Sequence, residues 1–392
     1  MTINAKRRAN SDGAVVHCHT ACACLVSRVL ASPSRRLFAL LGLLNSLLLG
    51  PAGCAPGDPG LQQLPQHQQQ YLVRLARVLD VPLPPLDWPM LSAPPRPREL
   101  LLPIEEQQID WLDLFALNEC DLGALIGYRN SGLGRVLEHS ERWLYERKLL
   151  RGLQRCKPGP EQAALFADLA RSKAQQLPLH RYNALLGGPE WRAFVSAPTL
   201  ALDARWDPAQ GAVVEQALYE LIAVLESPDE LSAAQVYDPL RTLRFTNAAG
   251  SVRQTWRQQT VVLRAAGELL EQAKAKPLCR NGQPTPRARH SQTVFTRYYI
   301  EQIQPQLSGL PHPERGWLAA LDQLVTAVMP PAASRTEQSA RLLAWHNSVF
   351  TAQRDSEFAR WREAIQRHSE AWRWHFEVCG LLPKPPINGL RE

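Results

Sequence analysis

Apolar residues recur at intervals of three and four along most of the chain after residue 103, which is the spacing of one buried face of an α-helix. Alternation of period two is scarce. The pattern therefore predicts an all-α fold, an irregular helical bundle over residues 104–392, with two lobes meeting near residues 190–230 as one option. Residues 235–245 read as an isolated strand pair, and residues 250–251 and 280–282 as turns. Further helices are predicted at 109–126, 143–156, 160–176, 211–225, 254–275, 293–307, 314–329 and 334–378.

The clearest helical stripe lies near the C-terminus. Its large residues fall on one helical face, and such a stripe is typical of a core. The segment at 334–378 reads as one long helix or two abutting ones. Residues on the stripe are Phe358, Trp361, Ile365, His368, Trp372, His375 and Phe376.

Residues 54–103 have a different composition, with 11 prolines between Ala55 and Pro103. This density favours extended polyproline segments over a compact core. Residues 66–80 contain no proline, and their leucines recur at helical spacing, so one short helix is predicted there. The segment reads as a tether that holds the folded body away from a surface, or as a strap along that body.

An uncharged run of thirteen residues, Leu37–Leu49, follows Arg35 and Arg36. A cationic start, a short apolar stretch and small residues after it are the layout of a secretory signal. Thirteen helical residues rise only about 20 Å, which is too short for a stable membrane span. Residues 1–53 therefore read as a signal segment.

Cys54 directly follows two small residues and resembles the acylated cysteine of a bacterial lipobox. Pro51 stands where an aliphatic residue is usual, which leaves cleavage by an ordinary signal peptidase or an uncleaved anchor as alternatives. Stable attachment needs several acyl chains. Ala55 rather than Asp follows the cysteine, and by resemblance to bacterial lipoproteins this implies lipid anchoring to the outer membrane, facing the periplasm.

Two histidines and three cysteines fall within residues 17–24, ahead of the signal. The cluster looks like a metal site, but zinc needs a fold that presents its ligands tetrahedrally. A misassigned start explains it better, with residues 1–34 outside the true protein. No metal site is predicted in the mature chain.

The formal net charge of +7 depends on the leader. Residues 1–53 hold six of the 44 Lys and Arg but one of the 37 Asp and Glu, so the remainder carries about +2. A folded body so near neutrality produces no overall positive field that would attract a polyanion. No nucleic-acid partner is therefore predicted.

Four cysteines follow Cys54, and none has the spacing of a zinc ligand set. An even number in an oxidising compartment predicts two disulfides. Three pairings are possible, and buried free thiols are the alternative. We favour Cys120 with Cys156, closing a helix pair, and Cys279 with Cys379, tying back the C-terminal helix.

Several runs resemble the uncharacterised bacterial lipoprotein family catalogued as domain of unknown function 3080. The run Arg129-Asn130-Ser131 followed by Leu133-Gly134-Arg135 is the most specific. The resemblance covers residues 66–380 and implies an exported lipoprotein, with no activity attached. Other residues that carry it are Arg98, Glu99, Leu100, Leu114, Phe115, Cys120, Leu122, Leu125, Ile126, Val136, Ser140, Tyr145, Glu146, Cys156, Phe295, Tyr298, Tyr299, Gln304, Pro305 and Leu307.

The run from Arg129 to Arg135, with Asn130, Ser131 and Gly134, has the donors to hold an anion or a partner. It lacks the spacing of a P-loop and a preceding strand. The competing interpretation is a turn between two helices, in which Asn130 or Ser131 caps the second helix.

No catalytic residue is assigned, because no nucleophile motif occurs. Neighbouring residues of a helix point about 100° apart, so adjacency of Ser, His and Glu has little weight. The chemistry-bearing residues considered are Asp121, Ser131, His139, Ser140 and Glu141.

Eleven tryptophans leave a glycan-binding groove open, with Trp361, Trp372 and Trp374 as its candidates, although core packing competes for them. His368 and His375, seven residues apart, are candidates for a weak metal site. No cofactor is indicated, and the oligomeric state is open. The sequence therefore predicts a non-enzymatic envelope lipoprotein that is anchored in the membrane and contacts another protein, with a glycan or peptide binder or an unrecognised hydrolase as alternatives.

Overall fold

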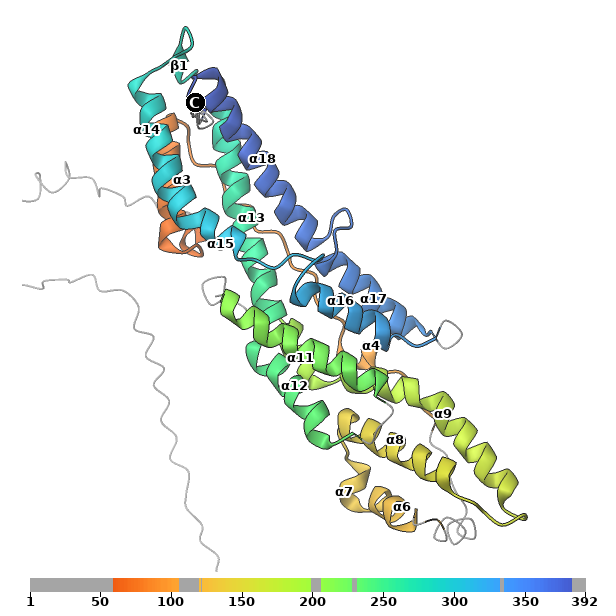
Figure 1. Cartoon of the computed structure of the whole chain (residues 1–392). Coiled ribbons are helices and arrows are strands. Elements are labelled where there is room, and N and C mark those ends of the chain that lie inside the picture. The colour runs from red at the N-terminus through yellow and green to blue at the C-terminus, as the bar shows by residue number, and fades with distance from the viewer. Residues whose placement is uncertain are drawn as a thin grey trace, which may run out of the picture. The chain divides into compact units, whose positions relative to one another are not determined.

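The computed structural model describes residues 59–105, 120, 122–198, 206–227, 231–331 and 335–382. The chain divides after Ala55, and every described residue belongs to the part from Pro56 to Glu392. The signal segment and Cys54 lie outside the described residues. Nearly all described elements are helices (Figure 1), which confirms the predicted all-α bundle.

Apart from the two-residue strands β1 and β2, the described elements are helical. Their bounds are α2 Pro59–Gln62, α3 Gln66–Leu79, α4 Pro97–Leu100, α6 Gly123–Asn130, α7 Gly132–Arg135, α8 His139–Arg155, α9 Ala163–Leu185, α10 Pro189–Val195, α11 Pro208–Glu226, α12 Ala233–Thr246, α13 Ala248–Ala273, β1 Cys279–Arg280, β2 Gln283–Pro284, α14 Pro286–Val294, the π-helix η2 Phe295–Ile303, α15 Gln304–Ser308, α16 Trp317–Val328, α17 Glu337–Phe350 and α18 Glu357–Val378.

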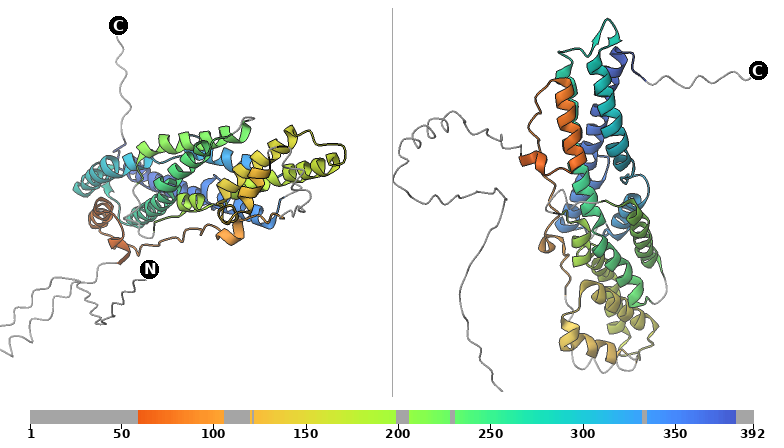
Figure 2. Two further views of the ribbon diagram at one scale, coloured as in Figure 1. Left: turned by 90° about the horizontal axis from the view of Figure 1, so that it is seen from below. Right: turned by 90° about the vertical axis from the view of Figure 1, so that its left-hand side faces the viewer.

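The long helix α13 forms the centre of the main core. It lies side by side with α18, and α3 and α10 also pack on it (Figures 1 and 2). The C-terminal stripe is buried as predicted, with Phe358 and His368 both at 0% exposure. Segment 334–378 forms two helices, and Ser356 starts the second by accepting a hydrogen bond from the Ala359 N–H at 2.9 Å.

Two local predictions were wrong. Residues 235–245 belong to helix α12, because Ser232 and Gln235 form a capping box that starts a helix just before them. Gly250 lies inside α13 and is not a turn residue. A Cβ there would lie 1.9 Å from the Ser196 carbonyl oxygen, so glycine lets α13 approach the end of α10 closely.

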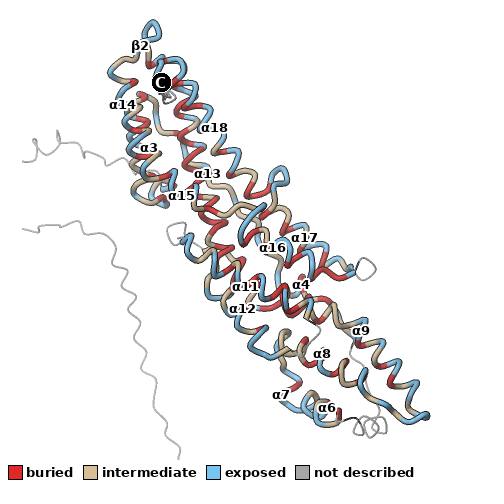
Figure 3. The backbone as a smooth tube through the Cα atoms, viewed as in Figure 1, coloured by how far each residue is buried: buried red, intermediate tan, exposed pale blue. Residues whose placement is uncertain are grey.

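The main core includes described residues on both sides of the lobe boundary that the sequence suggested near residues 190–230. Phe194, Val214 and Leu218 are fully buried in it. A second, smaller core lies between α6, α8 and α9. Its buried members are Leu122, Ile126, Tyr145, Leu149, Leu153, Phe166 and Leu169. Figure 3 shows that buried positions recur along the helices between exposed ones.

Both disulfides are present with the favoured pairing. Cys120–Cys156 borders the smaller core, and Cys279–Cys379 joins β1 to the end of α18. The predicted pairing is therefore confirmed.

The proline-rich segment packs against the folded body as a strap (Figure 2). Tyr71 and Leu72 of α3 are fully buried in the main core, and Leu102 is 3% exposed. The Asn183 side chain bonds the backbone N–H and carbonyl of Leu102 at 2.8 and 2.9 Å. The folded body therefore begins well before residue 104, because the apolar face of α3 is part of its core.

A buried ion pair fixes the middle of the strap. Arg253 of α13 bonds Glu357 of α18 through two nitrogens, at 2.9 and 2.8 Å. The Ser92 N–H donates to Glu357 at 2.7 Å, and the Ser92 carbonyl accepts from Arg253 at 2.5 Å. Arg253 also donates to the Val195 carbonyl and lies over the Trp345 ring. One charge pair thus joins two helices to the strap backbone.

His368 joins α18 to α3 by a second buried contact. The Tyr71 hydroxyl lies 2.7 Å from His368 Nε2, and the Trp372 indole N–H donates to both. The Tyr299 ring of η2 packs on the imidazole. Because no charged group faces it, burial lowers the pKa of His368 to about 3.

This histidine predicts a loss of stability in acid. The pKa of His368 is about 3 in the folded state and 6.5 in its ordinary state, so folding favours the neutral form. Its contribution is complete above pH 6.5 and decreases as the pH falls toward 3, by about 3 kcal/mol at pH 4. Denaturant unfolding of wild type and His368→Gln at pH 7 and pH 4 checks this, since the variant should show a smaller decrease. Equal decreases would contradict it.

Candidate functional site

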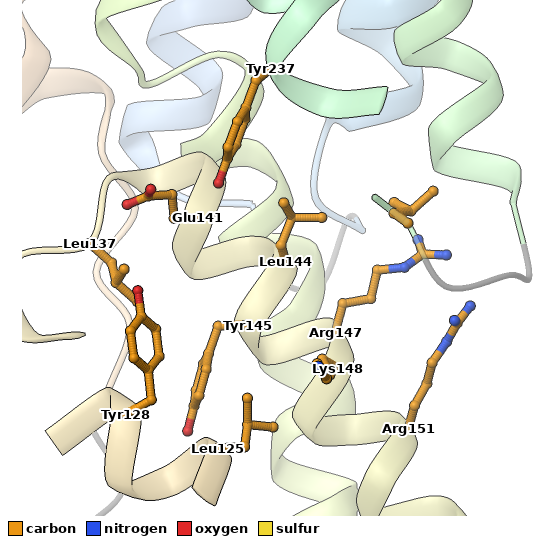
Figure 4. Close-up of a pocket in the computed structure, with 11 residues that line it drawn as sticks. Leu125, Tyr128, Leu137, Glu141, Leu144, Tyr145, Arg147, Lys148, Arg151 and Tyr237 are labelled. Carbon is orange, nitrogen blue, oxygen red and sulfur yellow. The ribbon is translucent and has the colours of Figure 1, made fainter. Parts of the chain in front are cut away.

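A cavity of 270 Å³ opens between α6, α8 and α12, beside the smaller core (Figure 4). Tyr128 enters it from α6, Tyr145 from α8 and Tyr237 from α12. We call it the tyrosine pocket. Its other lining residues are Leu125, Leu137, Glu141, Leu144, Arg147, Lys148, Arg151 and Leu231.

Glu141 lies at the edge of the pocket in the first turn of α8, because it forms the capping box of that helix with Glu138. The Glu138 N–H donates to it at 3.2 Å. Tyr237 projects from α12 toward it in Figure 4. Desolvation, followed by the nearby Glu141 charge and Tyr128, raises the pKa of Tyr237 to about 12. The phenol is therefore neutral at physiological pH and can donate a hydrogen bond.

The cations of the pocket occupy its other side. Arg147 donates to the Ser227 carbonyl, and desolvation followed by the charge of Arg151 lowers the pKa of its guanidinium. Arg147, Lys148 and Arg151 each have further interactions. They are thus already engaged within the protein.

Two more hollows adjoin the tyrosine pocket. One of 310 Å³ shares Glu141 and Tyr237 with it, and one of 530 Å³ shares Leu231. Asp238 lines both of these hollows. The three hollows therefore lie next to one another along α12, and together we call them the groove.

Exposed apolar side chains lie in the groove at Tyr128 and Phe245, and in and just after α7, which directly precedes the pocket residue Leu137 in the chain. Leu133 and Val136 are 75% and 74% exposed, and Phe245 is 77% exposed. The Tyr128 ring is half exposed. Exposed apolar residues that gather beside a groove are typical of an interaction surface.

The loop predicted as an anion or partner site is a turn between α6 and α7. Ser131 accepts from the Gly134 N–H at 3.1 Å and donates to the Tyr128 carbonyl at 2.7 Å. The Arg129 guanidinium donates to the Gly134 carbonyl at 2.8 Å. Ser131 therefore caps α7, as the turn interpretation expects, and Asn130 and Arg135 are exposed.

Gly134 is required by the packing of this turn. A Cβ on Gly134 would lie 2.0 Å from the Tyr128 carbonyl oxygen and 2.7 Å from the Arg129 Cα. The most specific run of the sequence therefore positions Tyr128 and α7, and none of its own side chains lines the tyrosine pocket.

A buried charge cluster lies behind the pocket and joins α8 to α9. Glu146, 1% exposed, pairs with Arg142 at 2.9 Å and with Lys173 at 3.0 Å. His180 lies 3.9 Å from Glu146, and desolvation lowers its pKa to about 4. The cluster is closed to solvent and supports α8 from within.

Of the residues considered for catalysis, those that the structure describes do not come together as one group. Ser140 and Glu141 line one hollow without His139, and Asp121 lies outside the described residues. His346 lies 3.0 Å from Asp322, but in the part that the structure describes no hydroxyl joins that pair. No described histidine meets both a carboxylate and a hydroxyl within hydrogen-bond distance.

Trp361, Trp372 and Trp374 do not form a groove in the described part of the chain. Trp361 and Trp372 are buried in the core, and only Trp374 of the three is partly exposed. His375 contacts the Leu270 carbonyl at 2.8 Å, so it and His368 have separate partners. The indoles of this stripe are therefore packing residues.

The described residues offer neither a metal-ligand cluster nor a membrane-spanning helix. They contain no group of three or more His, Cys, Asp or Glu side chains that could hold a metal ion. Nor does any helix within them have the length and apolarity to cross a membrane.

A family model described as "Protein of unknown function (DUF3080)" matches residues 68–383. The chain belongs to the DUF3080 family. The match begins within α3 and extends past α18, so the strap lies within the family's domain. Comparisons with curated proteins and with solved structures each found no match.

The tyrosine pocket was not predicted from the sequence. Its three tyrosines are separated by up to 109 positions, from Tyr128 to Tyr237, and Tyr237 fell in the segment expected to be strand.

Proposed function

We propose that this DUF3080 protein is an exported lipoprotein that acts through contact with another envelope protein. The observation that carries the proposal is the groove of the tyrosine pocket together with the exposed side chains of Leu133, Val136 and Phe245. Aromatic side chains in a concave apolar surface are enriched at protein interfaces.

The lipoprotein part of the proposal rests on the sequence. The apolar run Leu37–Leu49 and Cys54 direct the chain to an outer membrane facing the periplasm. Two disulfides agree with an oxidising compartment. No observation favours an enzymatic role over a binding role.

Photo-crosslinking in intact cells tests the contact surface. A photo-reactive phenylalanine analogue at position 133 or 245 of the full chain should yield one discrete adduct with another protein. The control is the same analogue at Val378, an exposed apolar position at the β1 end of the described part. The proposal fails if positions 133 and 245 give no adduct, or if all three positions give the same set of adducts.

A further inference from the structure

We propose that the tyrosine pocket binds a lysine or arginine side chain from a peptide segment of the partner, with aliphatic neighbours on each side. This inference rests on the proposed function and defines the chemistry of the partner. The occupant is thus a basic, apolar segment of a protein.

The groove contains two carboxylates at the start of α8, Glu141 in the tyrosine pocket and in the adjoining hollow, and Glu138 in that hollow. Glu138 and Glu141 accept backbone N–H groups at the start of α8, and among the described residues neither belongs to an ion pair. Arg147, Lys148 and Arg151 on the other wall have interactions within the protein. A cation that enters beside Glu141 therefore finds a carboxylate whose charge is not matched by a neighbouring cation.

The aromatic rings favour the same ligand. Tyr128 and Tyr237 flank Glu141, and Tyr145 completes the wall. Tyrosine rings attract a Lys or Arg cation through their faces. The combination of ring faces with a carboxylate recognises a long cationic side chain, whose methylene stem packs on Leu125 and Leu144.

The surroundings of the pocket favour a peptide ligand over a small cation. The groove continues into the hollow lined by Leu240 and Phe245, and Phe245 is 77% exposed. In that hollow Asp238 pairs with Arg241 at 3.0 Å and Glu190 lies 3.8 Å from Arg244. Both arginines of the hollow are therefore paired, Glu138 and Glu141 add negative charge at its edge, and Leu240 and Phe245 offer apolar surface to the residues that flank the cation.

An acidic partner is the competing possibility, since three cations line one wall. Because each of these cations already has an interaction within the protein, it is less available to pair with an anionic ligand. An anion would also have to lie beside Glu141 and the neutral phenols. The charge distribution of the described residues thus favours a basic segment.

Selection from a random dodecapeptide library tests the inference. We expect peptides bound by the full chain to be enriched in a Lys or Arg with aliphatic or aromatic neighbours. Glu141→Gln keeps the acceptor of the capping box and should abolish this enrichment. Glu377→Gln, at an exposed position of α18, should leave it unchanged.

The affinity of one selected peptide gives the magnitude. Replacing its basic residue by norleucine should weaken binding at least tenfold to wild type and by less than twofold to Glu141→Gln. The inference is overturned if the selected peptides are acidic, if none is enriched, or if both proteins lose the same affinity. Adducts from positions 133 and 245 combined with acidic peptides would overturn the inference alone, whereas absence of those adducts would overturn the proposed function.

Discussion

Glu357→Gln is expected to lower the free energy of unfolding by about 3–5 kcal/mol, because it leaves the Arg253 charge buried without its partner. Both side chains are almost fully buried, at 1% and 3% exposure. The variant also weakens the acceptor of the Ser92 N–H, so both the strap and α13 are held less firmly against α18. Denaturant unfolding monitored by tryptophan fluorescence measures the change.

A matched control lies on the same helix. Glu363 pairs with Arg367 at 2.6 Å on the exposed face of α18, and such surface pairs contribute about 0–1 kcal/mol. Glu363→Gln should therefore be close to wild type. Equal effects of Glu363→Gln and Glu357→Gln would show that the buried pair does not hold the strap.

Replacing Cys279 and Cys379 by serine is expected to cost about 5 kcal/mol. The disulfide closes a loop of 100 residues, and in the chain-entropy model a loop of that length restricts the unfolded state by about 4.7 kcal/mol. The same exchange at Cys120 and Cys156, which are 36 residues apart, should cost about 4 kcal/mol.

Unfolding curves of the oxidised and reduced wild-type protein provide the comparison. Reduction should lower the stability of the wild type and leave a variant without cysteines at 120, 156, 279 and 379 unchanged. A wild-type protein whose stability does not respond to reduction would contradict the disulfide contribution.

The periodic features of the fold were predictable from the sequence. Phe358, His368 and Trp372 share one helical face, and burial of one face explains the stripe without knowledge of the partner helices. The disulfides were predictable because four cysteines have only three possible pairings. Such inferences need only local spacing or a small number of alternatives.

The strap and α12 show why the rest was not predictable. Prolines indicate an extended segment, but Ser92 is held through its backbone N–H and carbonyl, which leave no signal in the residue type. In α12 the residues Val236 and Tyr237 favour a strand, whereas the capping box and the buried face formed with Leu240 decide for a helix. The tyrosine pocket joins three helices that only tertiary packing brings together.

The mass and first residue of the protein isolated from cell membranes test export and lipid attachment most directly. We predict a chain that begins at Cys54 and carries the added mass of acyl groups, and a Cys54→Ala variant that leaves the membrane fraction. An unmodified chain that begins ahead of residue 54 and remains in the cytosol would contradict the export proposed here.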